Sequence, residues 1–199
     1  MIIAYSNGPK RLLLRLREYI YPENVLIYPE FFDSKRALIT RNYSAYFRKI
    51  KEWRSVIIVA LWPDYFYASW PCRYDDIMWI FPLHHKKELE RVPNCITFIG
   101  YASQPSLRDY SLEWFMDYVP RPWWYLGANS RELYEAFKYN FDGMDVHSLS
   151  IPRWGYTNSI ENADKIAKWL IELAQGRILT KNDLFYGYKP LDRYFNAQR

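Results

Sequence analysis

The chain is poor in the residues that build metal and disulfide sites. Its 199 residues include only two cysteines, Cys72 and Cys95, and three histidines. The cysteines share no CxxC spacing, which excludes a zinc knuckle, and we expect two free or buried thiols rather than a disulfide. No HxH or HxxxH pair exists, and the adjacent His84 and His85 would point opposite ways on a strand. We therefore expect no resident metal and no other cofactor.

Long hydrophobic runs and glycine-rich loops are also missing. No apolar stretch reaches the roughly 18 residues of a membrane span, so we expect no membrane association. The first residues lack the basic region and the small-residue cleavage site of a signal peptide, which favours a cytoplasmic chain. The turn Asn7-Gly8-Pro9 does not match GxGxxG. This mismatch counts against a dinucleotide-binding fold.

Aromatic residues, in contrast, are abundant. Half of the chain is hydrophobic and 20% is aromatic, with 19 Tyr and 9 Trp. This composition argues against disorder and exceeds what filling a core requires. We expect some of these rings in pockets, on surfaces or at subunit contacts, which leaves an oligomer open.

The net charge of +5 is unevenly distributed. The densest basic stretch runs from Lys35 to Arg54, where Glu52 alone opposes the cations. Such a stretch fits a polyanionic partner such as nucleic acid, although a solvated helix face would explain it equally well. The candidate phosphate-binding residues are Lys35, Arg36, Arg41, Arg48 and Lys49.

Seven short apolar segments are candidates for strands. Several are continuous rather than alternating, which is typical of parallel strands buried on both faces. A further short strand is conceivable at Ala37–Thr40. The seven segments are Ile2–Tyr5, Val25–Phe32, Val56–Trp62, Ile77–Leu83, Ile96–Tyr101, Trp123–Leu126 and Met144–Leu149.

Stretches with helical periodicity lie between these segments. One follows Pro9, which suits a first helical turn. Others cover residues 43–53 and 112–119, and a short, weaker one covers 85–91. Two more begin at variant capping boxes, Asn129 with Glu132 and Asn158 with Glu161, and Gly176 ends the last of them.

The alternation of strands and helices predicts an α/β fold. We expect one (β/α) barrel of the TIM type over residues 1–176, with seven or eight strands, followed by a basic aromatic tail over 177–199. Such barrels usually need about 250 residues, so this one would be trimmed or incomplete. An open, doubly wound sheet is the alternative.

Polar residues and glycines at the ends of these strands mark the candidate site. In a parallel barrel the carboxyl ends of the strands form the active face. Three aspartates, Asp33, Asp64 and Asp145, would reach this face from separate strands. Each alone is an ordinary cap or turn residue, but together they would form an acidic pocket. The same positions also include Glu30, Ser34, His84, His85, Gly100, Ser103, Gly127, His147, Ser148 and Arg153.

An acidic pocket of this kind supports three chemistries. One aspartate can attack a sugar carbon while another holds the leaving base. Paired carboxylates can instead cleave a glycosidic bond with water. Aspartate and histidine can also hold a divalent metal, which the low histidine count disfavours.

The stretch from Tyr125 to Arg153 resembles the last part of the tRNA-guanine transglycosylase barrel. In that family a strand ending in Gly leads to a helix, then to a strand carrying Met-Phe-Asp, and then to Pro and Arg. Leu126-Gly127, Met144-Asp145 and Pro152-Arg153 are similar to these parts, although the Phe is absent here. The resemblance implies that Asp145 is a catalytic nucleophile and that Gly127 and Arg153 bind the substrate.

Earlier positions resemble the same family. Asp33-Ser34 is similar to the start of its Asp-Ser-Gly-Gly motif, whose aspartate works at the base and in proton transfer. Asp64 falls at a second base-recognising aspartate, and Gly100 at a glycine whose backbone contacts the base. His84 falls near a base-contacting Gln, which is a departure. The resemblance implies catalysis by Asp33 and substrate binding by Ser34, Asp64, His84 and Gly100.

Other features depart from the family's pattern. The family's zinc site of three cysteines and a histidine has no counterpart, and Lys35 and Arg36 replace the paired glycines. In length the chain is closer to small viral and phage relatives linked to deazaguanine modification of DNA. The resemblance implies a pentosyltransferase, a glycosyltransferase that exchanges a guanine-type base in DNA or tRNA through a covalent aspartate intermediate. A nucleoside- or glycoside-hydrolysing barrel and an inactive nucleic-acid-binding barrel are the alternatives.

Overall fold

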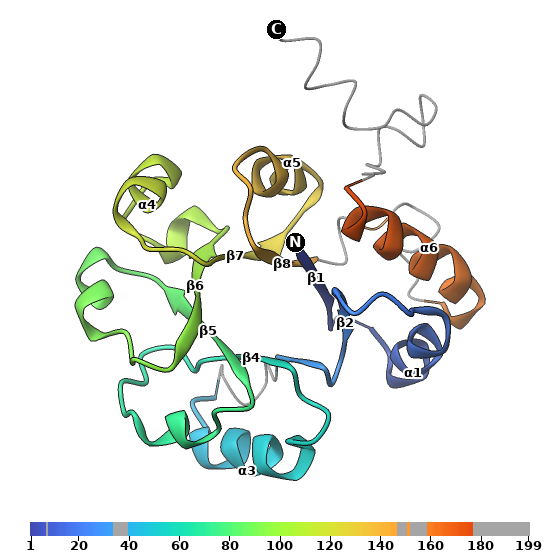
Figure 1. Cartoon of the computed structure of the whole chain (residues 1–199), viewed down its shortest axis with the longest axis horizontal. Coiled ribbons are helices and arrows are strands. Elements are labelled where there is room, and N and C mark those ends of the chain that lie inside the picture. The colour runs from blue at the N-terminus through green and yellow to red at the C-terminus, as the bar shows by residue number, and fades with distance from the viewer. Residues whose placement is uncertain (7, 34–39, 147–150, 152–158, 177–199) are drawn as a thin grey trace, which may run out of the picture. The chain divides into compact units, whose positions relative to one another are not determined.

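The structure is a computed structural model that describes residues 1–6, 8–33, 40–146, 151 and 159–176 (Figure 1). Several predictions therefore lie outside the described residues. They concern Ser34, Lys35, Arg36, His147, Ser148, Asn158, Arg153, most of the extra strand at Ala37–Thr40, and the tail over 177–199.

In the described part of the chain, eight strands form one sheet, in which β1 pairs in parallel with β2 and β8, and the strands from β3 to β7 pair in parallel with their neighbours. The strand order is β2-β1-β8-β7-β6-β5-β4-β3, so the first strand lies beside the last. This order, with helices between the strands, is that of a (β/α) barrel, which confirms the predicted fold class. The strands are β1 (Ile2–Tyr5), β2 (Val25–Ile27), β3 (Phe31–Phe32), β4 (Val59–Leu61), β5 (Met78–Leu83), β6 (Ile96–Ala102), β7 (Trp123–Ala128) and β8 (Gly143–Val146).

Strands β2 and β3 both come from one apolar segment, which raises the strand number from the predicted seven segments to eight. The prediction of a single strand over Val25–Phe32 is wrong, because the segment holds both β2 and β3. Pro29 lies between them and has no backbone N–H to donate to a ladder. The carbonyl oxygen of Glu30 instead accepts from the N–H groups of Ile58 and Val59 at 2.9 and 3.0 Å.

Short connections explain how a barrel fits into this chain. The connections from β4 to β5 and from β5 to β6 contain 3-10 turns where longer barrels have α-helices. No helix in the described part of the chain is long and apolar enough to cross a membrane. The helices are α1 (Lys10–Tyr19), α3 (Tyr43–Trp53), α4 (Leu112–Tyr118), α5 (Ser130–Lys138) and α6 (Ala163–Ala174), and the 3-10 turns are η1 (Trp70–Arg73), η2 (Lys86–Arg91), η3 (Pro105–Leu107) and η6 (Ile160–Asn162).

The chain divides into two compact units. The first contains Met1–Ile27 and the chain from Gly127 onward, and the second contains Tyr28–Leu126. In the first unit β1 pairs with both β2 and β8, and α1 packs beside α6. The side-chain amide of Asn24 donates to the carbonyl oxygens of Met1 and Ala174 at 3.1 and 3.3 Å.

Local helix signals of the first unit agree with the sequence. The capping box before α5 is confirmed: the Asn129 N–H donates to Glu132 at 2.7 Å, and the Glu132 N–H donates back to Asn129 at 3.3 Å. Gly176 follows α6 with a φ of +75°, a left-handed conformation that favours glycine. Before α6, the side chain of Ser159 accepts from the Glu161 N–H and caps the turn η6, whereas the N-cap residue of α6, Asn162, makes no side-chain cap bond.

The strands of the second unit are aromatic on both faces. The face toward the helices carries Trp79, which contacts Phe47 of α3, and Tyr101, which contacts Phe115 of α4. On the opposite face, Phe31 of β3 stacks on Trp124 of β7 with 5.6 Å between ring centroids and 4° between planes. Since strands β4, β5 and β6 separate these two residues in the sheet, the contact requires strong curvature of the sheet within this unit.

Gly100 lies inside β6 rather than at its end, where the sequence analysis placed it. A Cβ atom at this position would approach Leu126 Cδ1 to 2.8 Å and Ile80 Cγ2 to 3.1 Å. The missing side chain therefore makes room for larger residues of the neighbouring strands β5 and β7.

The cysteines contradict the expectation of free thiols. Cys72 and Cys95 form a disulfide, with 5.3 Å between their Cα atoms. The physical reason is topological. Cys72 precedes β5 and Cys95 precedes β6, and these two strands are parallel neighbours, so the chain segments that lead into them start side by side.

Replacing Gly100 by Ala should destabilise the protein by about 1–3 kcal/mol, the usual cost of overfilling a packed site. The added methyl group meets Leu126, so the cost should shrink in a Leu126→Ala background. Denaturant unfolding of the two single variants and the double variant measures this coupling. An equal cost of Gly100→Ala in both backgrounds would contradict the packing role.

Breaking the disulfide should lower the free energy of unfolding by about 3 kcal/mol, because the bond closes a loop between residues 23 apart. Urea unfolding with and without reductant measures this loss. The Cys72→Ala/Cys95→Ala variant is the control and should not respond to reductant. Two reactive thiols in the unreduced, denatured protein would refute the bond.

Candidate functional site

Three predicted site residues follow consecutive strands of the second unit. Asp33 comes directly after β3, Asp64 three residues after β4, and His84 directly after β5. Since parallel strands end at the same edge of a sheet, these side chains converge at one edge. The structure brings two of them, Asp64 and His84, into direct contact.

Asp64 and His84 form a hydrogen-bonded pair. The Nε2 atom of His84 lies 3.0 Å from Oδ1 of Asp64. His84 is nearly buried, with 6% of its surface exposed, whereas the side chain of Asp64 is 44% exposed. The histidine therefore anchors one oxygen of the carboxylate from below, and the aspartate faces solvent.

The surroundings of His84 favour its doubly protonated form. Its other ring nitrogen, Nδ1, lies 3.0 Å from the carbonyl oxygen of Leu107. A carboxylate and a carbonyl are both acceptors, so only a ring that carries protons on both nitrogens satisfies both contacts. Burial by itself lowers the pKa of His84. The hydrogen bond and charge of Asp64, the Leu107 carbonyl and the charge of Glu88 outweigh burial and raise the pKa above its ordinary value.

Tyr46 of α3 lies near both Asp33 and Asp64, because the charges of both affect it. Its hydroxyl is buried and donates to the carbonyl oxygen of Leu61, at the end of β4. Burial raises the pKa of Tyr46 well above its ordinary value, and the negative charges of Asp33 and Asp64 raise it further. The hydroxyl therefore remains a neutral donor to the Leu61 carbonyl.

An aromatic ring lies beside the pair. Tyr65 stacks on His84 with 5.4 Å between ring centroids, and the guanidinium of Arg41 lies 5.6 Å from the centre of the Tyr65 ring. Both residues have left-handed backbones, with φ of 58° for Tyr65 and 51° for Arg41. Bulky residues rarely adopt this conformation, and such outliers concentrate at ligand sites.

Glu88 has a structural role beneath the site. Only 2% of it is exposed. Its Oε2 atom accepts from the N–H groups of His84 and His85, each at 2.8 Å, and its Oε1 atom accepts from the Tyr67 hydroxyl at 2.7 Å. The carboxylate therefore fixes the end of β5 and the start of η2, and with them the backbone of His84.

This arrangement can bind a polar planar group and move a proton. The carboxylate of Asp64 accepts hydrogen bonds, the Tyr65 ring offers a face for stacking, and His84 supplies a compensating positive charge. Among the described residues, no three His, Cys, Asp or Glu side chains come together as a metal site requires.

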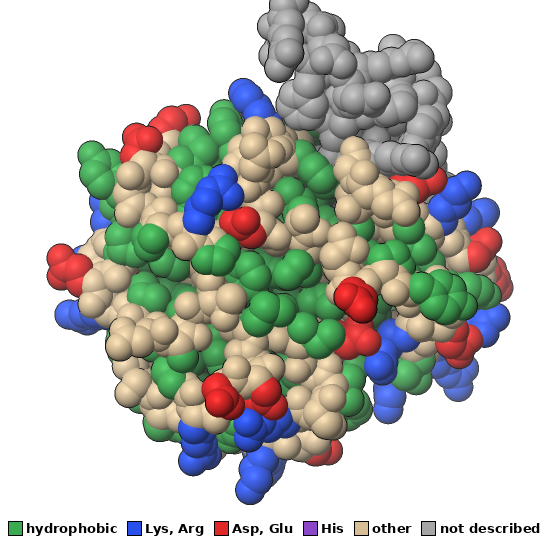
Figure 2. Space-filling model, in the orientation of Figure 1, with side chains coloured by type: hydrophobic (Ala, Val, Ile, Leu, Met, Phe, Trp, Pro, Cys, Tyr) green, Lys and Arg blue, Asp and Glu red, His purple; other side chains and the backbone are tan. Residues whose placement is uncertain are grey.

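The remaining predicted residues lie elsewhere. Asp145 lies inside β8 of the first unit, in register with Ala4 of β1. Gly127 lies in β7, also in the first unit, with a φ of 65°. Arg41 precedes α3, and Arg48 and Lys49 are exposed on it, so the three described cations of the predicted phosphate-binding set share one segment. Lys and Arg side chains project over the α3 region at the lower edge of Figure 2.

Sequence reasoning missed four contributors: Tyr46, Tyr65, Glu88 and the Leu107 carbonyl. Tyr46 was assigned only to a helix face. Glu88 had a signal, because an acidic residue three positions after His85 is typical of a capping box, which the structure contains. Tyr65 and the Leu107 carbonyl had none, since neither a backbone conformation nor a carbonyl direction appears in the sequence.

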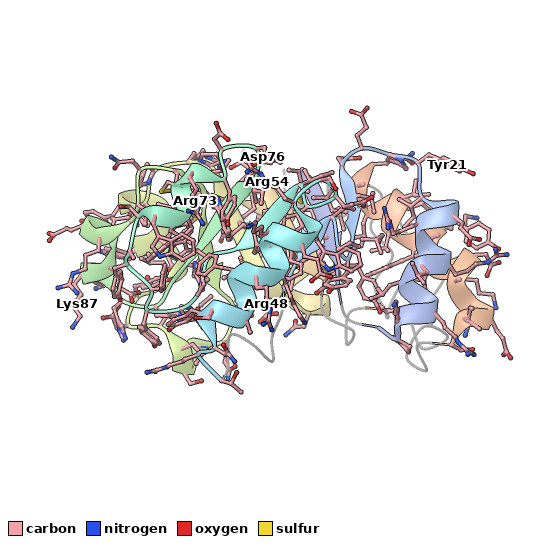
Figure 3. All side chains as sticks on the ribbon, turned by 90° about the horizontal axis from the view of Figure 1, so that it is seen from below. Tyr21, Arg48, Arg54, Arg73, Asp76 and Lys87 are labelled. Atoms are coloured by element: carbon pink, nitrogen blue, oxygen red, sulfur yellow. A yellow bond between two sulfur atoms is a disulfide. The ribbon has the colours of Figure 1, made fainter. Side chains whose placement is uncertain are left out.

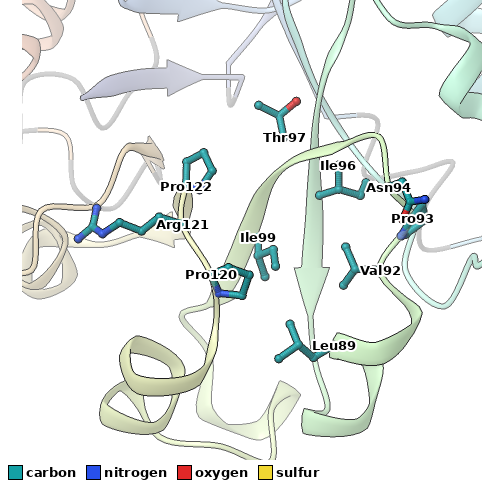
Figure 4. Close-up of a pocket in the computed structure, with 10 residues that line it drawn as sticks. All are labelled: Leu89, Val92, Pro93, Asn94, Ile96, Thr97, Ile99, Pro120, Arg121 and Pro122. Carbon is teal, nitrogen blue, oxygen red and sulfur yellow. The ribbon is translucent and has the colours of Figure 1, made fainter.

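The second unit also contains an apolar pocket of about 320 Å³, which is separate from these carboxylates (Figure 4). Its lining includes Ile96 at the start of β6 and Pro122 just before β7, so it lies at the amino ends of the strands. Arg121 is the one charged lining residue, and its guanidinium lies 4.1 Å from the centre of the Trp123 ring. Because its lining contains no Asp, Glu or His that could exchange a proton with a substrate, this pocket is not the candidate active site.

Comparison with known proteins finds a viral relative. The chain is 35% identical over 190 residues to the uncharacterized protein ORF192 of Acidianus two-tailed virus, covering 90% of this chain and 97% of the relative. No family model matches the chain. Among solved structures, the thiamine phosphate pyrophosphorylase from Pyrococcus furiosus aligns with a TM-score of 0.46 and 11% identity, over 86% of this chain and 96% of that one.

The stability of the protein should depend on pH through His84. Because its pKa is higher in the folded than in the unfolded state, its stabilising contribution is complete below about pH 6.5 and is lost as the pH rises through the folded pKa. Denaturant unfolding at several pH values measures this decline, and His84→Gln should abolish it. A wild-type stability that rises over this range and is unaffected by His84→Gln would refute the assignment.

Proposed function

The chain belongs to the same family as the ORF192 protein of Acidianus two-tailed virus, and from this premise we propose that it exchanges a guanine-type base in nucleic acid. Asp145 is the nucleophile, Asp33 and Asp64 recognise the base, and His84 positions Asp64. The observation that carries the proposal is the contact between Asp64 and His84 beside the exposed ring of Tyr65.

The chemistry of the base supports these assignments. A base removed from its stack is recognised through hydrogen bonds to its Watson–Crick edge and through stacking. The guanine edge donates protons, and the ionised carboxylate of Asp64 only accepts. With Oδ1 of Asp64 held by His84, the second oxygen can accept from the base while Tyr65 offers a stacking face. A histidine with both protons committed to acceptors serves to hold Asp64 rather than to abstract a proton.

The proposed reaction has two displacements. The carboxylate of Asp145 bonds to the sugar C1′ as the bond from C1′ to the base nitrogen breaks, and the departing base takes a proton from Asp33. The incoming base returns its proton to Asp33, and its nitrogen displaces the Asp145 carboxylate from C1′. Protons and electron pairs balance without a cofactor.

Exposed cations next to the site support a nucleic-acid substrate. Arg41 contacts Tyr65, and Arg48 and Lys49 are exposed on α3. Figure 3 shows Arg48 on this helix. Cations in such positions bind phosphates and orient the polymer without reading its sequence. A cytoplasmic location of the protein is part of the same proposal.

Hydrolysis is the second candidate, because the same carboxylates serve a reaction in which water replaces the incoming base. The exposure of Asp64 favours it, since water reaches that carboxylate directly. Release of a base without incorporation of another distinguishes hydrolysis from exchange.

Covalent trapping tests the proposal. Wild-type protein mixed with DNA, or separately with tRNA, and a deazaguanine base should give an adduct that survives denaturation, and Asp145→Asn should give none. Asp33→Asn should slow formation of the adduct by about 10²- to 10⁴-fold, the usual contribution of a group that handles protons. Asp117→Asn, which alters an exposed aspartate of α4, is the matched control. If the protein binds nucleic acid but forms no adduct with either polymer, base exchange is rejected in favour of an inactive nucleic-acid-binding barrel.

A further inference from the structure

The connection from β4 to β5, residues 62–77, presents a group of exposed aromatic rings. Tyr65, Tyr67 and Trp70 are 45%, 37% and 43% exposed. They lie within six positions of one another, in a connection whose regular structure is the short turn η1. Aromatic rings that remain partly exposed to water are often covered by a ligand or a partner. Three such rings in one segment therefore indicate a contact surface.

Each of these rings has an arginine over it. The guanidinium groups of Arg41, Arg91 and Arg73 lie 5.6, 5.5 and 5.0 Å from the ring centres of Tyr65, Tyr67 and Trp70. We call these six residues the aromatic strip.

The arginines of the strip lack carboxylate partners. Among the described residues, none of the three forms a salt bridge. Arg54, labelled next to Arg73 in Figure 3, differs in this respect, because it pairs with Asp76 at 2.7 Å. The positive charges of the strip's arginines are therefore available to pair with an anionic partner.

The strip is held in place at several points. The disulfide joins Cys72, next to Arg73, to Cys95. The hydroxyl of Tyr67 donates to the buried Glu88, and Trp70 packs edge-on against Phe47 of α3 at 4.5 Å. Rings fixed in this way lose little conformational entropy when a ligand stacks on them.

We propose that the aromatic strip binds single-stranded nucleic acid, with bases stacked on its rings and phosphates paired with its arginines. This inference rests on the proposed function and specifies the form of the substrate. Single strands expose the faces of their bases, whereas a duplex buries them in its own stack. Tyr65, at one end of the strip, also stacks on His84, so a strand bound here leads a base toward Asp64.

Fluorescence anisotropy of a labelled single-stranded oligonucleotide of about 16 nucleotides tests the proposal, in DNA and RNA forms. Trp70→Leu should weaken binding about 5- to 100-fold, the effect of losing one stacked base. Arg91→Gln removes a charge without disturbing the core and should reduce the slope of log K against log salt by about 0.7. Tyr118→Leu and Arg121→Gln, an exposed ring and an exposed cation away from the strip, are the matched controls and should bind as wild type does.

Three results would overturn the proposal. The first is unchanged binding by both strip variants. The second is equal affinity for a duplex or for an abasic strand of the same length, because neither exposes base faces on which the rings could stack. The third is displacement of the strand by an acidic peptide at equal charge concentration, which would identify a protein partner. Thermal unfolding shows whether Trp70→Leu is folded. If Trp70→Leu is unfolded, binding by Arg91→Gln alone decides the test.

The strip and the proposed reaction can fail separately. Loss of strand binding in the strip variants, together with no adduct or base exchange in wild type, would retain the strip and reject the reaction. Base exchange by Trp70→Leu on a single strand at an unchanged KM would retain the reaction and reject the strip.

Discussion

One buried histidine with an acceptor at each ring nitrogen organises the candidate site. His84 lies between the carboxylate of Asp64 and the carbonyl oxygen of Leu107, and its backbone N–H donates to the buried Glu88. An imidazolium satisfies every one of these contacts, whereas a neutral ring leaves an acceptor facing a lone pair. The charge on His84 therefore fixes the position of Asp64, and the exposure of Asp64 makes the pair available to a ligand.

The barrel topology supplies the rest of the site. Parallel strands end at one edge of the sheet, which places both Asp33 and Asp64 near enough to Tyr46 for their charges to raise its pKa. At the other end of the same strands, the segments that lead into β5 and β6 are close enough for the disulfide between Cys72 and Cys95. The β4–β5 connection is thus held near its end by the disulfide and at its middle by the hydrogen bond from Tyr67 to Glu88. A connection without a long helix is thereby rigid enough to display exposed rings.

The sequence predicted the parts of this structure that depend on local pattern. Buried parallel strands appear as apolar runs, and the Asn129–Glu132 box and Gly176 mark helix ends through their own backbone chemistry. Asp64 and His84 could be named because strand ends converge in any parallel barrel. The disulfide could not, since it depends on which segments become neighbours. The Leu107 acceptor and the left-handed Tyr65 could not either, because a carbonyl direction and a backbone angle have no residue signature.

The charge state of His84 is the most direct test of this account. Nitrogen-15 NMR of the imidazole rings reports protonation of each ring nitrogen, and three histidines in the chain keep the spectrum simple. The account predicts that both nitrogens of His84 carry protons at neutral pH and that Asp64→Asn lowers the pKa of this ring. A His84 ring that is singly protonated at pH 7, with a pKa unmoved by Asp64→Asn, would contradict it.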